Sequence, residues 1–190
     1  MIKSNFIIKS NFFICRLAFL LFFAFVPSLQ AQYHPVPLAA AETRVPEHLV
    51  AASVRVSNSH GNFAQGGSGV VIGLDKEKKQ ALVLTCKHVF SDGLGKITVH
   101  FPDGDKKAAK YFNQAENADL LLLSIAADDK TPWVPLADKE PAEGDWTAQV
   151  GYPNGRGPNE RFGKVSGYRS YSNRIPNLTL SFPTISGDSG

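Results

Sequence analysis

The sequence predicts an all-β fold, either a barrel or a sandwich. Three observations carry this prediction: apolar runs of strand length alternate with turn-forming residues, the runs recur about every 10–15 residues, and no long amphipathic helical pattern interrupts them. The predicted strands cover residues 50–56, 69–73, 80–85, 96–101, 108–113, 119–125, 147–151, 162–168 and 178–182.

Turn-forming residues separate the predicted strands. Asp, Gly, Asn and Pro gather in residues 75–79, 102–105, 128–132 and 153–155, where they favour reversal of the chain. The lysine-rich stretch 76–79 is predicted to be a solvated hairpin tip. Residues 86–91 are predicted to form a helical turn.

The positive charge of the chain lies at its N-terminus. The 190 residues carry a formal net charge of +3, and Lys3, Lys9 and Arg16 lie within the first 31 residues, which contain no acid. The remaining residues hold 17 acidic side chains and an equal number of basic ones, so no nucleic-acid partner is expected. Their composition is that of one globular domain with a hydrophobic core.

Residues 1–31 have the pattern of a secretory signal peptide. Basic residues precede the apolar run 17–26, which is followed by Pro27 and by a small residue, Ala31, at the expected cleavage site. The alternative, an uncleaved membrane anchor, needs about 20 apolar residues, and Arg16 interrupts any extension of the run. The sequence therefore predicts cleavage after Ala31, a secreted or periplasmic protein, and no membrane attachment after cleavage.

The predicted mature chain has two parts. Residues 32–46 contain three prolines and no clear periodicity, so they are expected to be an N-terminal arm or linker. Residues 47–190 are expected to form the folded domain. Cys86 is its single cysteine, which excludes an internal disulfide.

Three separated residues have the side chains of a nucleophile, a base and an orienting acid. His88 follows the apolar run 81–85, Asp119 precedes the apolar run 120–123, and Ser189 lies in the glycine-flanked loop 186–190. A serine hydroxyl needs a base to take its proton as it attacks an acyl carbon, and histidine has a suitable pKa. A carboxylate would then fix the imidazole tautomer. The N–H groups of Gly187 and Ser189 are the expected oxyanion donors.

Each of these residues also has a simpler interpretation. A single histidine after an apolar strand is more often structural, Asp119 could cap a strand, and residues 187–190 could be an ordinary turn. Together, in the order His–Asp–Ser, they favour a catalytic triad. No metal is expected because the other histidines have no metal-type spacing, and no cofactor motif occurs.

The chain resembles the bacterial trypsin-like serine peptidases over about residues 48–190, and among them the disulfide-free branch of the HtrA/DegP type. The motifs that carry the resemblance are Gly67-Ser-Gly69, Leu84-Thr-Cys-Lys-His88, Ala118-Asp119-Leu-Leu-Leu-Leu123, Val150-Gly-Tyr-Pro153, Gly163-Lys-Val-Ser-Gly167 and Gly187-Asp-Ser189-Gly. The resemblance implies two perpendicular antiparallel β-barrels of six strands each. It also implies a serine endopeptidase that acts on proteins or peptides, with His88 and Asp119 from the first barrel and Ser189 from the second.

The sequence departs from the family pattern in three places. It ends one residue after Ser189, before the strands that complete the second barrel, so the chain as given is expected to be incomplete and inactive. Pro183 occupies the position where trypsin-type members have a pocket acid, which disfavours Lys or Arg and favours a small or apolar side chain at the cleaved position. Cys86 is expected to be a small, buried apolar residue, with a catalytic thiol as the lesser alternative.

Two alternatives to the secreted endopeptidase remain. One is a non-catalytic trypsin-like fold that acts as a binding or chaperone module. The other is a quality-control protease whose peptide-binding domain would follow Gly190.

Overall fold

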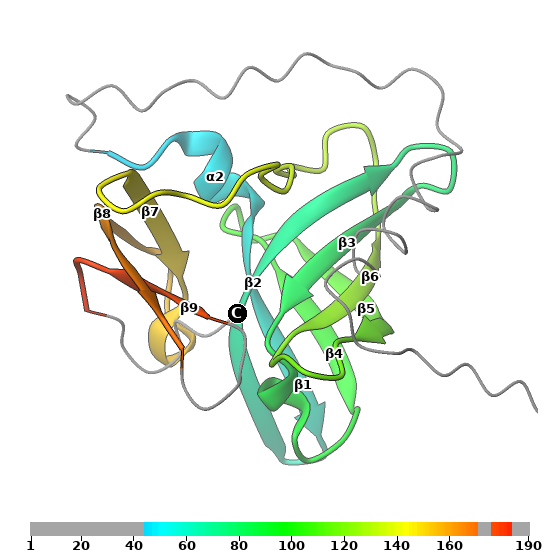
Figure 1. The fold of residues 1–190 in the computed structure, drawn as a ribbon. Coiled ribbons are helices and arrows are strands. Elements are labelled where there is room, and N and C mark those ends of the chain that lie inside the picture. The colour runs from blue at the N-terminus through cyan, green and yellow to red at the C-terminus, as the bar shows by residue number, and fades with distance from the viewer. Residues whose placement is uncertain (1–43, 171–175, 184–190) are drawn as a thin grey trace, which may run out of the picture. The chain divides into compact units, whose positions relative to one another are not determined.

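The computed structural model describes residues 44–170 and 176–183, all within one compact unit, Leu38–Gly190 (Figure 1). These residues form nine strands, one α-helix and two short 3₁₀ helices. In chain order the elements are α2 (Glu47–Ala52), β1 (Ser53–His60), β2 (Phe63–Asp75), β3 (Gln80–Thr85), η1 (Lys87–Phe90), β4 (Lys96–His100), β5 (Lys106–Gln114), β6 (Leu121–Ala126), β7 (Trp146–Gly151), η2 (Pro153–Gly155), β8 (Asn159–Arg169) and β9 (Asn177–Leu180).

The first six strands close into a barrel. They follow the order β1-β2-β3-β6-β5-β4, and every neighbouring pair is antiparallel. Burial alternates along β3 and β6, because successive side chains of a strand point to opposite faces. The interior face is therefore apolar. The predicted all-β fold is confirmed, and the barrel rather than the sandwich is its form.

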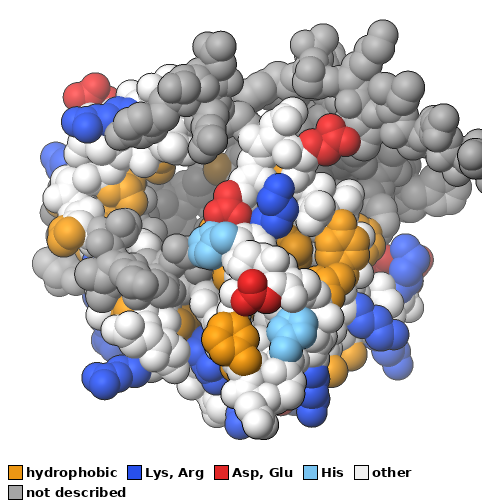
Figure 2. Space-filling view, turned by 90° about the horizontal axis from the view of Figure 1, so that it is seen from below, with side chains coloured by type: hydrophobic (Ala, Val, Ile, Leu, Met, Phe, Trp, Pro, Cys, Tyr) orange, Lys and Arg blue, Asp and Glu red, His pale blue; other side chains and the backbone are white. Residues whose placement is uncertain are grey.

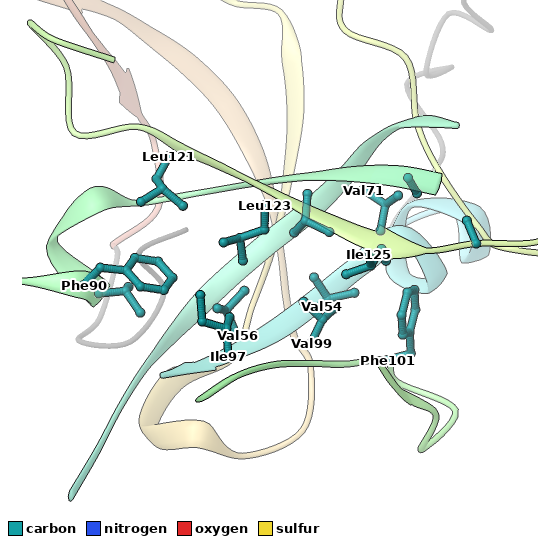
Figure 3. Packing of buried hydrophobic residues seen from close by; sticks show 14 residues of the cluster. Val54, Val56, Val71, Phe90, Ile97, Val99, Phe101, Leu121, Leu123 and Ile125 are labelled. Atoms are coloured by element: carbon teal, nitrogen blue, oxygen red, sulfur yellow. The ribbon is translucent and has the colours of Figure 1, made fainter. Parts of the chain in front are cut away.

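The barrel interior is filled by aliphatic side chains from all sides (Figure 3). Strand β6 contributes Leu121, Leu123 and Ile125, and β1 contributes Val54 and Val56. The helical turn η1 adds Phe90 at one end, and Phe101 follows β4 at the other. This packing holds the end of β3 against the start of β6, next to His88 and Asp119.

Shortening Leu123 to alanine is expected to lower the free energy of unfolding by about 2–5 kcal/mol, since the side chain is completely buried and its loss leaves a cavity. Urea unfolding followed by tryptophan fluorescence measures the change. Leu122→Ala, on the same strand but only half-buried, is the matched control and is expected to cost much less. Equal losses for both variants would contradict this account of the core.

The predicted strand over residues 50–56 is wrong in its first half. Residues 47–52 form the helix α2, and the carbonyl of Pro46 accepts hydrogen bonds from the amides of Leu49 and Val50. Glu47 in the first turn suits the positive end of the helix dipole. An apolar run this short has no periodicity that separates a helical turn from a strand.

Strand β2 is much longer than the predicted strand 69–73. Its first half contains Gly66, Gly67 and Gly69, which gave no strand pattern in the sequence. A side chain at Gly69 would lie 3.0 Å from the carbonyl oxygen of Leu84 and 3.1 Å from Val56. The glycines therefore allow close approach of neighbouring strands rather than marking a loop.

His100 belongs to a hydrogen-bonded network on β1 and β4. Arg55 Nη2 lies 3.1 Å from His100 Nδ1, and Ser57 Oγ lies 2.9 Å from Nε2. Since Arg55 can only donate, Nδ1 accepts, and Nε2–H donates to the hydroxyl of Ser57. Ser57 in turn donates to the carbonyl of Thr98 at 3.3 Å. The network holds the neutral ring.

The pKa of His100 lies below the usual histidine value of 6.5, because burial and then the charges of Arg55 and Lys106 disfavour the protonated ring. In the unfolded chain the ring binds a proton near pH 6.5, whereas in the fold it does so only at lower pH. Stability is therefore expected to fall as pH drops from 6.5 toward the lowered pKa. His100→Gln is expected to weaken this pH dependence of urea unfolding, while His48→Gln on the exposed face of α2 leaves it unchanged. An unaltered slope in His100→Gln would contradict the assignment.

The strands β7, β8 and β9 form a separate antiparallel sheet (Figure 1). The rings of Trp146 and Phe162 stack across β7 and β8, with centroids 5.1 Å apart. A side chain at Gly163 would come within 2.5 Å of Ser181 Oγ, so any larger residue would require the side chains of Ser181 and Phe182 beside the end of β9 to shift. This three-stranded sheet confirms the predicted partial second β structure.

Tyr152 connects the segment after β7 to the barrel. Its hydroxyl donates to the carbonyl of Ser53 at 2.9 Å, and its amide donates to Ser68 Oγ at 2.8 Å. Burial raises the pKa of Tyr152 to about 12, so the phenol stays protonated and remains a donor. The carbonyl of Ser68 also accepts from Thr85 Oγ1 at 2.8 Å. Ser68 therefore bonds both to Tyr152, which follows β7 of the second sheet, and to Thr85 at the end of β3.

The predicted N-terminal segments lie mostly outside the described residues. The signal peptide 1–31 and most of the arm 32–46 fall there. Within the described part of the chain, Val45 is buried. None of the helices in that part has the length and apolar character needed to cross a membrane.

Candidate active site

His88 is presented at the surface by the turn that follows β3. Thr85, the last residue of the strand, is fully buried and is held by its bond to the carbonyl of Ser68. In the next turn, η1, Val89 and Phe90 point into the core. Because these neighbours face inward, the side chain of His88 faces outward and is 53% exposed.

Asp119 lies in the loop between β5 and β6, two residues before β6 begins. The amide of Ala115 donates to the carbonyl of Leu120 at 2.9 Å and closes this loop. The predicted strand 119–125 therefore starts late, at Leu121, and Asp119 is left free of the ladder. Its side chain is 54% exposed, which differs from the buried carboxylate of a complete triad.

The structure brings His88 and Asp119 into direct contact. Asp119 Oδ2 lies 2.6 Å from His88 Nδ1, and Oδ1 accepts a hydrogen bond from the His88 amide at 2.9 Å. Both carboxylate oxygens therefore bind the same residue, one through its ring and one through its main chain. In Figure 2, histidine side chains (pale blue) lie at the surface next to acidic ones (red).

The contact fixes the charge of Asp119 and the tautomer of the neutral His88 ring. Desolvation raises the pKa of Asp119, but the hydrogen bonds from the ring and amide of His88 outweigh it and lower the pKa below the usual 3.8. The pair therefore stabilises the fold above this usual pKa and ceases to do so as pH falls through the lowered value. An ionised carboxylate only accepts, so Nδ1 carries the hydrogen and Nε2 is left as a base.

The remaining predicted site residues are placed as follows. Ser189 and Gly187, the predicted nucleophile and oxyanion donors, lie outside the described residues. Pro183 is exposed, and its carbonyl accepts a hydrogen bond from Arg161. Together with β9 and Phe182 it lines a shallow hollow of about 380 Å³, to which neither His88 nor Asp119 contributes.

Asn58 is a supporting residue that the sequence analysis missed. It is completely buried in β1, where its side-chain amide donates to the carbonyls of Gly93 at 2.8 Å and Val89 at 3.4 Å. Its carbonyl accepts from the amide of Gly95 at 2.8 Å. Asn58 thus holds the segment that follows His88. The signal for it in the sequence was a polar residue that continues the inward face of the strand, two positions after Val56 and four after Val54.

The position of Gly95 explains why this segment lies so close to β1. A side chain there would approach within 2.3 Å of the carbonyl oxygen of Ser59. The glycine lets the main chain at residue 95 come close enough to bond with Asn58. The same segment is also contacted by His60, whose Nε2 lies 3.1 Å from the carbonyl oxygen of Gly93.

The sequence and the fold match known peptidases. The family described as "Trypsin-like peptidase domain" matches residues 67–190. Among curated proteins, the probable periplasmic serine endoproteases, DegP-like, of Rickettsia conorii and Rickettsia prowazekii are each 31% identical over 90 residues, which is 47% of this chain. That stretch covers only 16% of either relative, so the chain spans a small part of their length.

Two solved structures have a similar fold. An HtrA-type protease with a tripeptide matches with a TM-score of 0.65 at 21% identity, over 76% of this chain and 47% of that one. The serine endoprotease from Yersinia pestis matches with a TM-score of 0.63 at 26% identity, over 77% of this chain and 53% of that one. The family match extends over well over half of the sequence, and the barrel and the relatives agree with it: this chain belongs to the trypsin-like peptidase family and resembles its HtrA/DegP type.

Proposed function

We propose that residues 47–190 are part of the catalytic domain of a secreted or periplasmic serine endopeptidase that hydrolyses peptide bonds of proteins. The observation that carries the proposal is the bidentate contact between His88 and Asp119, which leaves His88 Nε2 as an exposed base. The periplasmic DegP-like relatives and the signal-like residues 1–31 support the location.

In the proposed mechanism Ser189 is the nucleophile. His88 takes the hydroxyl proton as the serine oxygen attacks the peptide carbonyl, and the bond between carbonyl carbon and nitrogen breaks when His88 returns that proton to the leaving amine. Water, activated by the same ring, then hydrolyses the acyl-enzyme. The amides of Gly187 and Ser189 stabilise the oxyanion in both steps.

Asp119 has an electrostatic and a positioning role in this mechanism. Its lowered pKa keeps it ionised, so it stabilises the imidazolium that forms during each step. Pro183 near the expected pocket favours substrates with a small or apolar side chain before the cleaved bond.

Labelling with a fluorophosphonate probe tests the proposal on the full-length gene product. We expect covalent labelling at neutral pH that is lost in Ser189→Ala and retained in Ser186→Ala, a serine three residues earlier in the same stretch. Absence of labelling in a folded protein would overturn the catalytic proposal and favour the non-catalytic binding module.

A further inference from the structure

One cluster of side chains in the described residues combines three different metal-binding groups. The sulfur of Cys86, a ring nitrogen of His88 and a carboxylate oxygen of Asp119 all lie within 4.8 Å of one another. Across residues 44–170 and 176–183, no other three His, Cys, Asp or Glu side chains meet in this way. The cysteine is therefore more than a core residue, although it also packs against the hydrophobic cluster.

The local chain explains why the thiol reaches the site. Cys86 has an extended backbone conformation between β3 and η1, two residues before His88, and it carries a thiol rather than a disulfide. The side chain is half-buried while those of His88 and Asp119 are exposed, so an ion could reach the cluster from solvent. Asp119 is distant in sequence, which is why motif spacing gave no metal site.

The donor set suits a thiophilic divalent cation. Thiolate, imidazole and carboxylate are the groups that hold Zn²⁺, usually with a tetrahedral arrangement. Tetrahedral ligands at zinc distances are about 3.3–3.6 Å from one another. Donor atoms that already lie within 4.8 Å of one another therefore need only a small contraction, together with an opening of the 2.6 Å contact between His88 and Asp119.

We propose that Cys86, His88 and Asp119 bind Zn²⁺ reversibly, and that the bound ion switches the peptidase off. The inhibitory part rests on the proposed function, whereas the binding part does not. A metal on Nδ1 replaces the hydrogen bond to Asp119, so the ring hydrogen moves to Nε2, and Nε2 can no longer accept the serine proton. The thiol proton passes to solvent, water completes the coordination of the ion, and no electron is transferred.

Metal titration of the metal-free, full-length protein tests the binding. Cobalt(II) is expected to give a thiolate-to-metal charge-transfer absorption that Zn²⁺ abolishes by displacement. Cys86→Ala is expected to lose this absorption and to weaken Zn²⁺ binding in calorimetry by roughly tenfold or more. His48→Ala, which removes an exposed histidine elsewhere, is the matched control and is expected to bind both ions unchanged. No cobalt–thiolate absorption in the wild-type protein would overturn the proposal.

Fluorophosphonate labelling separates this inference from the proposed function. Zn²⁺ is expected to block labelling of the wild-type protein, and a chelator to restore it, while Cys86→Ala is labelled normally and resists Zn²⁺. Equal Zn²⁺ sensitivity in the wild-type protein and Cys86→Ala would overturn the regulatory inference and leave the peptidase proposal intact. A cobalt–thiolate absorption in a protein that is never labelled would support the site and overturn the peptidase proposal.

Discussion

Asp119→Asn is expected to lower kcat by about ten-thousand-fold, by analogy with the same change in other Ser-His-Asp peptidases. An asparagine side chain has nearly the same shape and can still accept the hydrogen bond from the His88 amide. Its NH₂ group, however, would face Nδ1 as a donor. The ring would then carry its hydrogen on Nε2, where it cannot take the proton of Ser189.

The rate of fluorophosphonate labelling and the cleavage of a fluorogenic casein, both on the full-length gene product, measure this effect. Asp138→Asn is the control, because it removes the same charge from an exposed loop outside the site. Urea unfolding of both variants separates catalysis from stability. A fall of less than about tenfold in the Asp119 variant would contradict the orienting role.

Asn58→Ala is expected to lower the free energy of unfolding by about 3 kcal/mol, since it leaves the carbonyl of Val89 and the amide of Gly95 without the Asn58 side chain as a partner and removes one of the hydrogen bonds to the carbonyl of Gly93. The wild-type side chain binds Val89, Gly93 and Gly95 at once. Without it, the segment after His88 is no longer tied to β1. We therefore also expect slower labelling of Ser189, at temperatures where the variant is still folded.

A second substitution at this position sharpens the prediction. Asn58→Asp keeps the acceptor for the amide of Gly95 but places an acidic oxygen against the carbonyls of Val89 and Gly93. Since a buried ionised carboxylate facing acceptors is unfavourable, this variant is expected to be at least as unstable as Asn58→Ala at neutral pH. Asn159→Ala, at the exposed start of β8, is the matched control. If urea unfolding gave Asn159→Ala as large a loss of unfolding free energy as either Asn58 variant, the role of the buried amide would be contradicted.

The sequence was sufficient to predict short strands that lie next to well-marked turns. The interval 80–85 coincides with β3, and 147–151 begins one residue inside β7. Both segments have the length of a strand and lie next to turn-forming residues, at 75–79 and 153–155, so local pattern and tertiary structure agree. His88 and Asp119 come together because each lies next to the end of an apolar strand. The strands concerned, β3 and β6, are antiparallel neighbours, and the last residue of β3, Thr85, lies opposite the first residue of β6, Leu121.

Other features depend on long-range packing and could not be predicted from local patterns. Gly66 and Gly69 gave no strand pattern in the sequence, because what requires a glycine there is the close approach of β1, and at Gly69 also of β3. Cys86 was predicted to be a core residue because the carboxylate near it belongs to Asp119, which lies 33 positions later in the chain. Asn58 was hidden because its three partners lie more than 30 residues further on.

The two bonds that meet at Ser68 have a consequence for fluctuations of the native protein. Its hydroxyl oxygen accepts a hydrogen bond from the amide of Tyr152. Its carbonyl accepts a hydrogen bond from the hydroxyl of Thr85, three residues before His88. An opening event that frees the Tyr152 amide must therefore disturb the residue that also anchors β3. In native-state hydrogen exchange this amide should share the protection of the barrel amides rather than the faster exchange of a loop.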